Sequence, residues 1–113
     1  MKRDMQVIRK LILYLEEAEP GCDSDDIDLE LDTDVLEYHM RLMDEAGLIC
    51  ITPMRGGVIF NRMTWQGHDF ADAARDDVVW KKTLRKVAET TKSVTFELLT
   101  HLLKGTLAKE FVD

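Results

Sequence analysis

The sequence predicts a mostly helical protein of the α+β class, and three patterns indicate it. Apolar residues recur at helical spacing in several segments of the 113-residue chain. One short run, residues 27–32, alternates between apolar and acidic residues. Two β-rich runs, residues 48–52 and 58–64, flank a five-residue segment with two glycines, which is typical of a β-hairpin. The length favours a single domain, residues 1–113.

The part of the chain before the hairpin is predicted to contain two helices with a strand between them. Residues 3–17 form one apolar helical stripe. Residues 27–32, IDLELD, have the period of two of a half-buried strand. Residues 33–46 have a second helical stripe, with Asp32, Thr33 and Asp34 as candidates for the N-cap and Gly47 suited to the position after the last turn.

Helices are also predicted after the hairpin. The first begins within QGHDFADAARDD, and the second spans about 77–90. A last helix begins near Ser93. Its apolar stripe is wider than one core contact needs, so it is a candidate surface for a homodimer: Leu98, Leu99, Leu102 and Leu103.

The stretch RMTWQGHDF, residues 62–70, joins the hairpin to the next helix. We expect Thr64 to end the strand and cap the turn, Gly67 to allow a tight chain reversal, and Phe70 to re-enter the core. Trp65 is expected to close the base of the hairpin, where truncation of a buried tryptophan would cost about 3–5 kcal/mol.

A helix followed directly by a β-hairpin with a Gly-rich tip is the core of a winged helix. The hairpin is then the wing, and the strand at 27–31 would pair at its base. Between the helices at 3–17 and 33–46 there is room for a positioning helix of a single turn only. The predicted architecture is therefore helix, strand, helix and wing, followed by two or three helices.

No group of residues predicts catalysis or a cofactor. His68 and Asp72 are spaced as half of a metal site, which needs three or four ligands. A calcium loop in CDSDDIDLELD would have Asp28 where glycine is required. His39 is expected to be half-buried and hydrogen-bonded locally. We therefore expect a protein without enzymatic activity, metal or cofactor.

The expected compartment is the cytoplasm. Cys22 and Cys50 form no CxxC pair, which is typical of a reduced protein with incidental thiols. The apolar run LILYL is too short for a signal sequence, and no stretch approaches the roughly 20 apolar residues of a membrane helix.

Charge is distributed unevenly along the chain, whose net charge is −7. Residues 16–45 have thirteen acidic side chains and one basic side chain, whereas residues 1–15 and 46–113 have net charges of +3 and +2. The acidic block would repel nucleic-acid phosphates. We therefore predict an acidic docking face for a protein with a basic surface: Asp23, Asp25, Asp26, Asp28, Glu30, Asp34 and Glu37.

DNA binding is the alternative. In DNA-binding winged helices the second helix enters the major groove and the wing touches the backbone. Here that helix would present one basic residue among acidic ones: Asp34, Glu37, Arg41, Asp44 and Glu45. Contacts with phosphates would instead use the wing and the helix at 77–90: Arg55, Arg62, Lys81, Lys82, Arg85 and Lys86.

Three stretches are distinctive: MKRDMQVIRKLILYLEE, LEYHMRLMDEAGLI and MTWQGHDFADAARDDVVWKKT. Together they resemble a family of short bacterial and prophage-encoded proteins of unknown function, in the same broad group as the YjcQ-like winged-helix proteins. The resemblance implies a winged-helix fold, an association with mobile elements and no catalytic residue. The chain departs from this family in its unusually acidic stretch 22–34 and its short wing.

Overall fold

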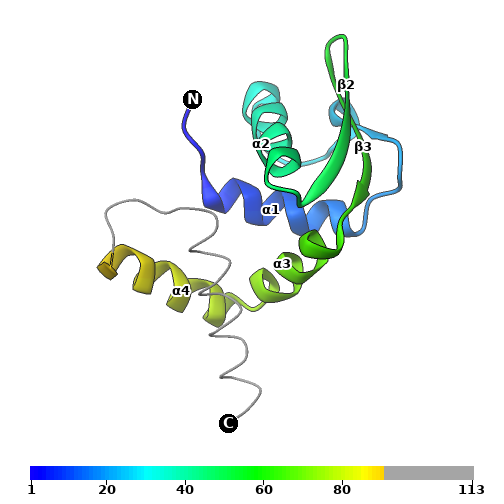
Figure 1. The fold of residues 1–113 in the computed structure, drawn as a ribbon. Coiled ribbons are helices and arrows are strands. Elements are labelled where there is room, and N and C mark those ends of the chain that lie inside the picture. Colours follow the sequence, from blue (N-terminus) through cyan, green and yellow to red (C-terminus); the bar gives the residue numbers. More distant parts are fainter. Residues whose placement is uncertain (91–113) are drawn as a thin grey trace. The chain divides into compact units, whose positions relative to one another are not determined.

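The structure, a computed structural model, describes residues 1–90. The chain divides into two compact units, Met1–His68 and Asp69–Asp113, which are described separately. The elements are α1 (Met5–Glu16), β1 (Cys22–Asp23), the 3-10 turn η1 (Ser24–Asp26), α2 (Thr33–Glu45), β2 (Ile49–Met54), β3 (Gly57–Met63), α3 (Trp65–Arg75) and α4 (Asp77–Thr90) (Figure 1). The predicted α+β class is confirmed.

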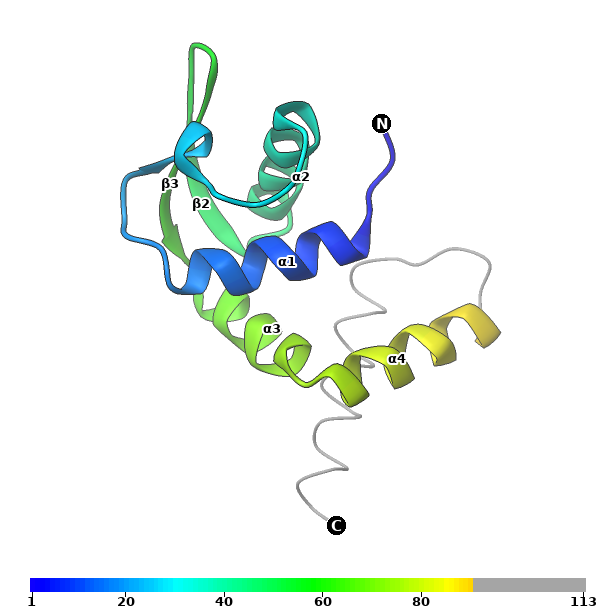
Figure 2. The same cartoon turned by 180° about the vertical axis from the view of Figure 1, so that it is seen from behind.

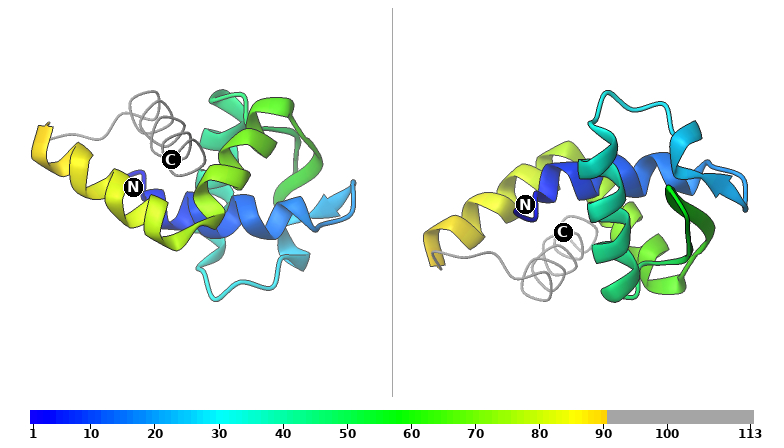
Figure 3. Two further views of the ribbon diagram at one scale, coloured as in Figure 1. Left: turned by 90° about the horizontal axis from the view of Figure 1, so that it is seen from below. Right: turned by 90° about the horizontal axis from the view of Figure 1, so that it is seen from above.

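Helix α1 forms where its apolar stripe predicts. Asp4 is its N-cap, and its side chain accepts a hydrogen bond from the Gln6 N–H at 2.9 Å. The buried face packs against α2 and contacts β3. Figure 3 shows α2 crossing α1. The buried residues of this face are Met5, Val7, Ile8, Leu11, Ile12 and Leu15.

The prediction of a strand at residues 27–32 is wrong. The third strand is β1, where Cys22 pairs with Phe60 and Asp23 pairs with Ile59. Residues 27–32 form a loop from η1 to α2, which Figure 2 shows in cyan.

The alternation in IDLELD reflects burial without strand pairing. Ile27 is buried and Leu29 and Leu31 are half-buried, but the backbone N–H groups of the loop bond elsewhere. The Asp28 N–H donates to the Tyr14 hydroxyl at 3.2 Å, and the Leu31 N–H donates to the Leu29 carbonyl at 2.7 Å. A period of two therefore located the apolar side of this segment and not its hydrogen bonds.

Helix α2 confirms the second predicted helix. The Asp32 side chain accepts from the Asp34 N–H at 3.0 Å and caps its first turn. Gly47 follows the helix with φ +79°, a conformation that favours glycine. The single-turn element η1 fills the space that the sequence left before α2.

The hairpin is confirmed, but its predicted five-residue loop is wrong. Met54 pairs with Gly57, so Arg55 and Gly56 alone form the turn, with φ +85° at Gly56. Pro53 belongs to β2 and not to the loop. A proline is accepted there because β2 is an edge strand of the sheet, whose order is β1-β3-β2.

Helix α3, which begins in the first unit and ends in the second, and helix α4 of the second unit match the two helices predicted after the hairpin. Asp76 lies between them, and its side chain accepts from the N–H groups of Val78 and Val79 at 2.9 and 3.1 Å. The rings of Phe70 and Trp80 are both buried and meet edge to face, 6.1 Å apart. The predicted helix near Ser93 and its leucine stripe, the candidate homodimer surface, lie outside the described residues.

Candidate protein-binding surface

The predicted acidic residues lie on three consecutive pieces of chain. Asp23, Asp25 and Asp26 lie at the end of β1 and on η1; Asp28 and Glu30 lie on the loop; Asp34 and Glu37 lie on α2. We call these seven residues the acidic surface. Five of them are exposed, whereas Asp23 and Glu37 are half-buried. Within residues 1–90, none of the seven forms an ion pair.

Local hydrogen bonds hold the first piece in place. The Asp23 side chain accepts from the Asp25 N–H at 2.9 Å and caps η1. Ser24 is buried, and its hydroxyl accepts from the Val58 N–H at 3.1 Å. This bond attaches η1 to the beginning of β3, so the acidic turn has a fixed position beside the hairpin.

Two members of the acidic surface lie near Gly57, the first residue after the turn of the hairpin. A Cβ atom built on Gly57 would lie 3.5 Å from Asp23 Oδ1 and 3.6 Å from Glu37 Oε1. It would also lie 2.7 Å from Ser24 Oγ, which is too close for a side chain. The fold thus brings carboxylates from β1 and α2, which are distant in the sequence, close to Gly57, and the Ser24 hydroxyl leaves room for glycine alone at this position.

Helix α2 has the two faces that its sequence predicts. Leu36, His39, Met40 and Met43 are buried. Its exposed side chains are mainly acidic, with Arg41 as the exposed basic residue of this helix. One acidic side chain has a structural bond, because Asp44 Oδ1 accepts from the Ile51 N–H at 3.3 Å.

The predicted DNA-contacting residues are all exposed. Arg55 and Arg62 lie on the β2–β3 hairpin, in the unit Met1–His68. Lys81, Lys82, Arg85 and Lys86 lie on α4, in the other unit. Lys81 pairs with Asp77 at 3.0 Å, an exposed contact one helical turn apart that contributes little stability. Each group is therefore a candidate surface of its own unit.

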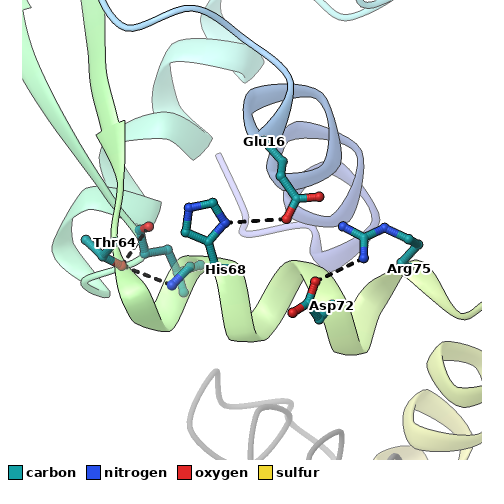
Figure 4. Close-up of polar contacts among 7 residues, drawn as sticks. Glu16, Thr64, His68, Asp72 and Arg75 are labelled. Carbon is teal, nitrogen blue, oxygen red and sulfur yellow. Dashed lines mark hydrogen bonds and ion pairs between the residues drawn. The ribbon is translucent and has the colours of Figure 1, made fainter.

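Figure 4 shows the polar contacts at the junction between the hairpin and α3. The Thr64 hydroxyl accepts from the Gly67 N–H at 3.0 Å and lies 2.6 Å from the Gly47 carbonyl oxygen, to which it donates. Thr64 therefore ends β3 and caps α3, as predicted. The tight reversal predicted at Gly67 is wrong: this residue lies within α3, where a Cβ would overlap the Leu48 carbonyl oxygen.

The histidine and aspartate of this junction have separate partners. His68 Nδ1 lies 3.5 Å from Glu16 Oε2, and Asp72 Oδ1 accepts from Arg75 at 3.0 Å (Figure 4). The described part of the chain contains no group of three His, Cys, Asp or Glu side chains placed to hold a metal ion. The geometry gives His68 a contact with Glu16 at the end of α1.

The expectation that Trp65 closes the base of the hairpin is wrong. Its side chain is 83% exposed. The reason is helical periodicity, because α3 turns Gly67, Phe70, Ala71 and Ala74 inward. Trp65 precedes Gly67 by two positions, about 200° around the helix, and so points outward.

Trp65→Ala is therefore expected to change the free energy of unfolding by less than about 0.5 kcal/mol in urea. The substitution should also remove most of the tryptophan fluorescence that acrylamide quenches, because the second tryptophan, Trp80, is 1% exposed. A loss of more than about 1 kcal/mol would show that Trp65 packs as the sequence first suggested.

His39 is more buried than predicted and has a partner that the sequence did not reveal. It is 1% exposed. Its Nδ1 lies 2.7 Å from the Val35 carbonyl oxygen, which can only accept, so Nδ1 carries the proton. Its Nε2 accepts from the Asp4 N–H at 2.9 Å. His39 thus connects α2 to the N-cap of α1, which is a structural role.

Cys22 is not an activated nucleophile. Burial raises the pKa of its thiol, and the negative charges of Asp26 and then Asp23 raise this pKa further. The thiol therefore stays protonated at neutral pH, whereas a reactive cysteine requires a lowered pKa. Both Cys22 and Cys50 are free and half-buried.

Comparison with known proteins places the chain among hypothetical proteins. The family described as "Hypothetical protein (DUF2513)" matches residues 2–94. An uncharacterized protein of Haemophilus influenzae is 31% identical over 110 residues, which cover 92% of this chain and 90% of that protein. No solved structure matches. Among the described residues, no helix is long and apolar enough to cross a membrane.

Proposed function

The chain belongs to the DUF2513 family of hypothetical proteins, and from its geometry we propose that it is a non-catalytic module whose acidic surface binds a protein with a basic surface. The single observation that supports this most is the set of seven carboxylates on β1, η1, the following loop and α2, none of which forms an ion pair within the described residues 1–90. Carboxylates without internal cations are available to pair with Lys and Arg of a partner.

We also propose that Met1–His68 is a winged helix. The order of elements supports this: a helix, a short strand, a one-turn helix, a second helix and a hairpin. The sheet order β1-β3-β2 places the first strand beside the second strand of the wing. In this proposal α2 occupies the position of the DNA-reading helix.

The charge of this unit favours a protein partner over DNA. Residues 1–68 have fourteen acidic and seven basic side chains, so this unit accounts for the whole net charge of −7. Phosphates would meet repulsion from Asp34, Glu37 and Glu45 on α2. The same charges would attract a basic protein and speed its association.

The alternative is a DNA-binding regulator that contacts phosphates through the wing or α4. The exposure of all six predicted basic residues favours it. The resemblance to prophage-encoded proteins is compatible with either function and adds the expectation that the partner is part of a mobile element or of its bacterial host.

The proposal is tested by neutralising part of the acidic surface. Asp28→Asn, Glu30→Gln and Asp34→Asn should leave the fold unchanged, because none of these exposed side chains has a hydrogen bond or ion pair within residues 1–90. The matched control is Glu17→Gln, Glu19→Gln and Glu45→Gln, three exposed carboxylates of the same unit outside the acidic surface. Both variants change the net charge equally.

Capture from host lysate, quantified by mass spectrometry, is the measurement. We expect at least one basic protein to bind the wild type and the control but to be reduced about tenfold or more with the acidic-surface variant. Raising the salt from about 0.05 to about 0.3 M should weaken the same capture. Equal loss with both variants would contradict the proposal, because net charge and not the acidic surface would explain binding.

Fluorescence anisotropy with a mixed-sequence DNA duplex distinguishes the proposed protein-binding module from the DNA-binding regulator. We expect no binding at low salt. Micromolar binding that weakens steeply with salt would contradict the proposal and support the regulator. The pairs Arg55→Ala with Arg62→Ala and Lys82→Ala with Arg85→Ala would then identify the wing or α4 as the contact.

A further inference from the structure

The wing leaves one edge of the sheet without a strand partner. In the order β1-β3-β2, β2 is the edge strand of the wing, and its last residues, Thr52, Pro53 and Met54, are exposed. Unpaired N–H and C=O groups on such an edge are a template for a strand of another chain. Partners of this kind add to the sheet through backbone hydrogen bonds.

The hydrogen bonds of β3 show which residues of β2 face this edge. The Val58 N–H donates to Ser24, and the Phe60 carbonyl accepts at 2.8 Å from the loop before β1. Both residues therefore direct their backbone polar groups away from β2. In an antiparallel pair, two opposite residues either exchange backbone hydrogen bonds with each other or both direct their N–H and C=O groups away from the partner strand. Their partners, Pro53 and Ile51, must therefore direct their backbone polar groups toward the free edge.

Neither of these two outward positions offers a free donor. The Ile51 N–H is occupied, because it donates to Asp44 Oδ1 of α2 at 3.3 Å. Pro53 has no N–H. Thr52 and Met54, the alternate residues of β2, direct their backbone polar groups toward β3. From Ile51 to Met54, the outward edge thus keeps carbonyl acceptors but no available N–H.

We infer that Asp44 and Pro53 together close the free edge of the wing to a second copy of this chain. An added β-strand requires both donors and acceptors from the edge, and from Ile51 to Met54 this edge supplies acceptors alone. The exposed, uncharged run Thr52-Pro53-Met54 would otherwise suit strand addition. The carbonyl groups of this edge can still accept hydrogen bonds from single donors, but they cannot form the two-way ladder of an added strand. This inference does not depend on the acidic surface.

The test is to restore both donors. Pro53→Val returns an N–H, and Asp44→Ala frees the Ile51 N–H. Sedimentation velocity over a concentration series should show that the double variant associates about tenfold or more tightly than the wild type, and each single variant less so. Glu45→Ala, an exposed neighbour of Asp44 with no bond to β2, is the matched control and should behave as wild type.

Hydrogen exchange of the Ile51 amide provides a second readout. In Asp44→Ala this amide should exchange faster than in the wild type, and in the associated double variant it should exchange more slowly than in Asp44→Ala. Equal association constants for wild type and double variant would overturn the inference. Association without slowing of Ile51 exchange would overturn it as well, because the new contact would lie elsewhere. If the double variant fails to fold, unchanged Ile51 exchange in Asp44→Ala still contradicts it.

Discussion

Replacing Gly67 with alanine is expected to destabilise the protein by about 3 kcal/mol or more, at or above the upper end of the usual range for an overpacked interior. The new Cβ would overlap the Leu48 carbonyl oxygen and lie 2.7 Å from Met63 Cγ. The carbonyl is fixed, since it accepts from the Thr64 N–H at 3.0 Å. Relief therefore requires α3 to move away from the end of α2 and from β2.

Urea unfolding followed by circular dichroism measures this change. Gln66→Ala is the matched control, because its side chain is exposed at the adjacent position of α3 and should shift the free energy of unfolding by less than about 0.5 kcal/mol. A Gly67→Ala protein as stable as the wild type would show that α3 does not approach Leu48 closely.

Replacing His39 with alanine is expected to lower the free energy of unfolding by about 3–4 kcal/mol. The loss combines a cavity in the α1–α2 interface with unpaired polar groups. The Asp4 N–H would lose the Nε2 acceptor that it binds at 2.9 Å. The Val35 carbonyl would lose the Nδ1 donor at 2.7 Å.

The control for His39 is the other histidine of this unit that contacts α1. His68→Ala removes a half-exposed contact with Glu16 and should cost less than about 1 kcal/mol. The variant His39→Phe fills the cavity but restores no hydrogen bond. We expect it to recover only part of the loss, and full recovery would show that packing alone explains the effect.

Much of the fold follows from local chemistry in the sequence. The apolar stripes located α1 and α2, and the capping residues 32–34 and Gly47 marked the two ends of α2, where the structure selects Asp32 as the N-cap. The two β-rich runs located the hairpin. These signals are reliable because helical periodicity and capping depend on residues within a few positions of one another.

The sequence-based predictions are wrong where contacts between residues that are distant in the sequence determine the structure. The strand expected at residues 27–32 failed because β1 pairs with β3 and the loop bonds to Tyr14 instead. Trp65 was expected to be buried because of its size, whereas the orientation of α3 turns it outward. The role of Gly67 depends on the Leu48 carbonyl, which no local pattern indicates.

For the candidate surfaces, too, some features follow from the sequence and others only from the tertiary structure. The sequence alone determined that residues 16–45 are densely acidic and that helical periodicity places many of these charges outside the core. Only the tertiary structure decided that Asp23 and Glu37 lie near Gly57, that His39 binds Asp4, and that Asp44 occupies the N–H of Ile51. Charge and periodicity are properties of neighbouring residues, whereas each of these contacts depends on how separate elements pack against one another.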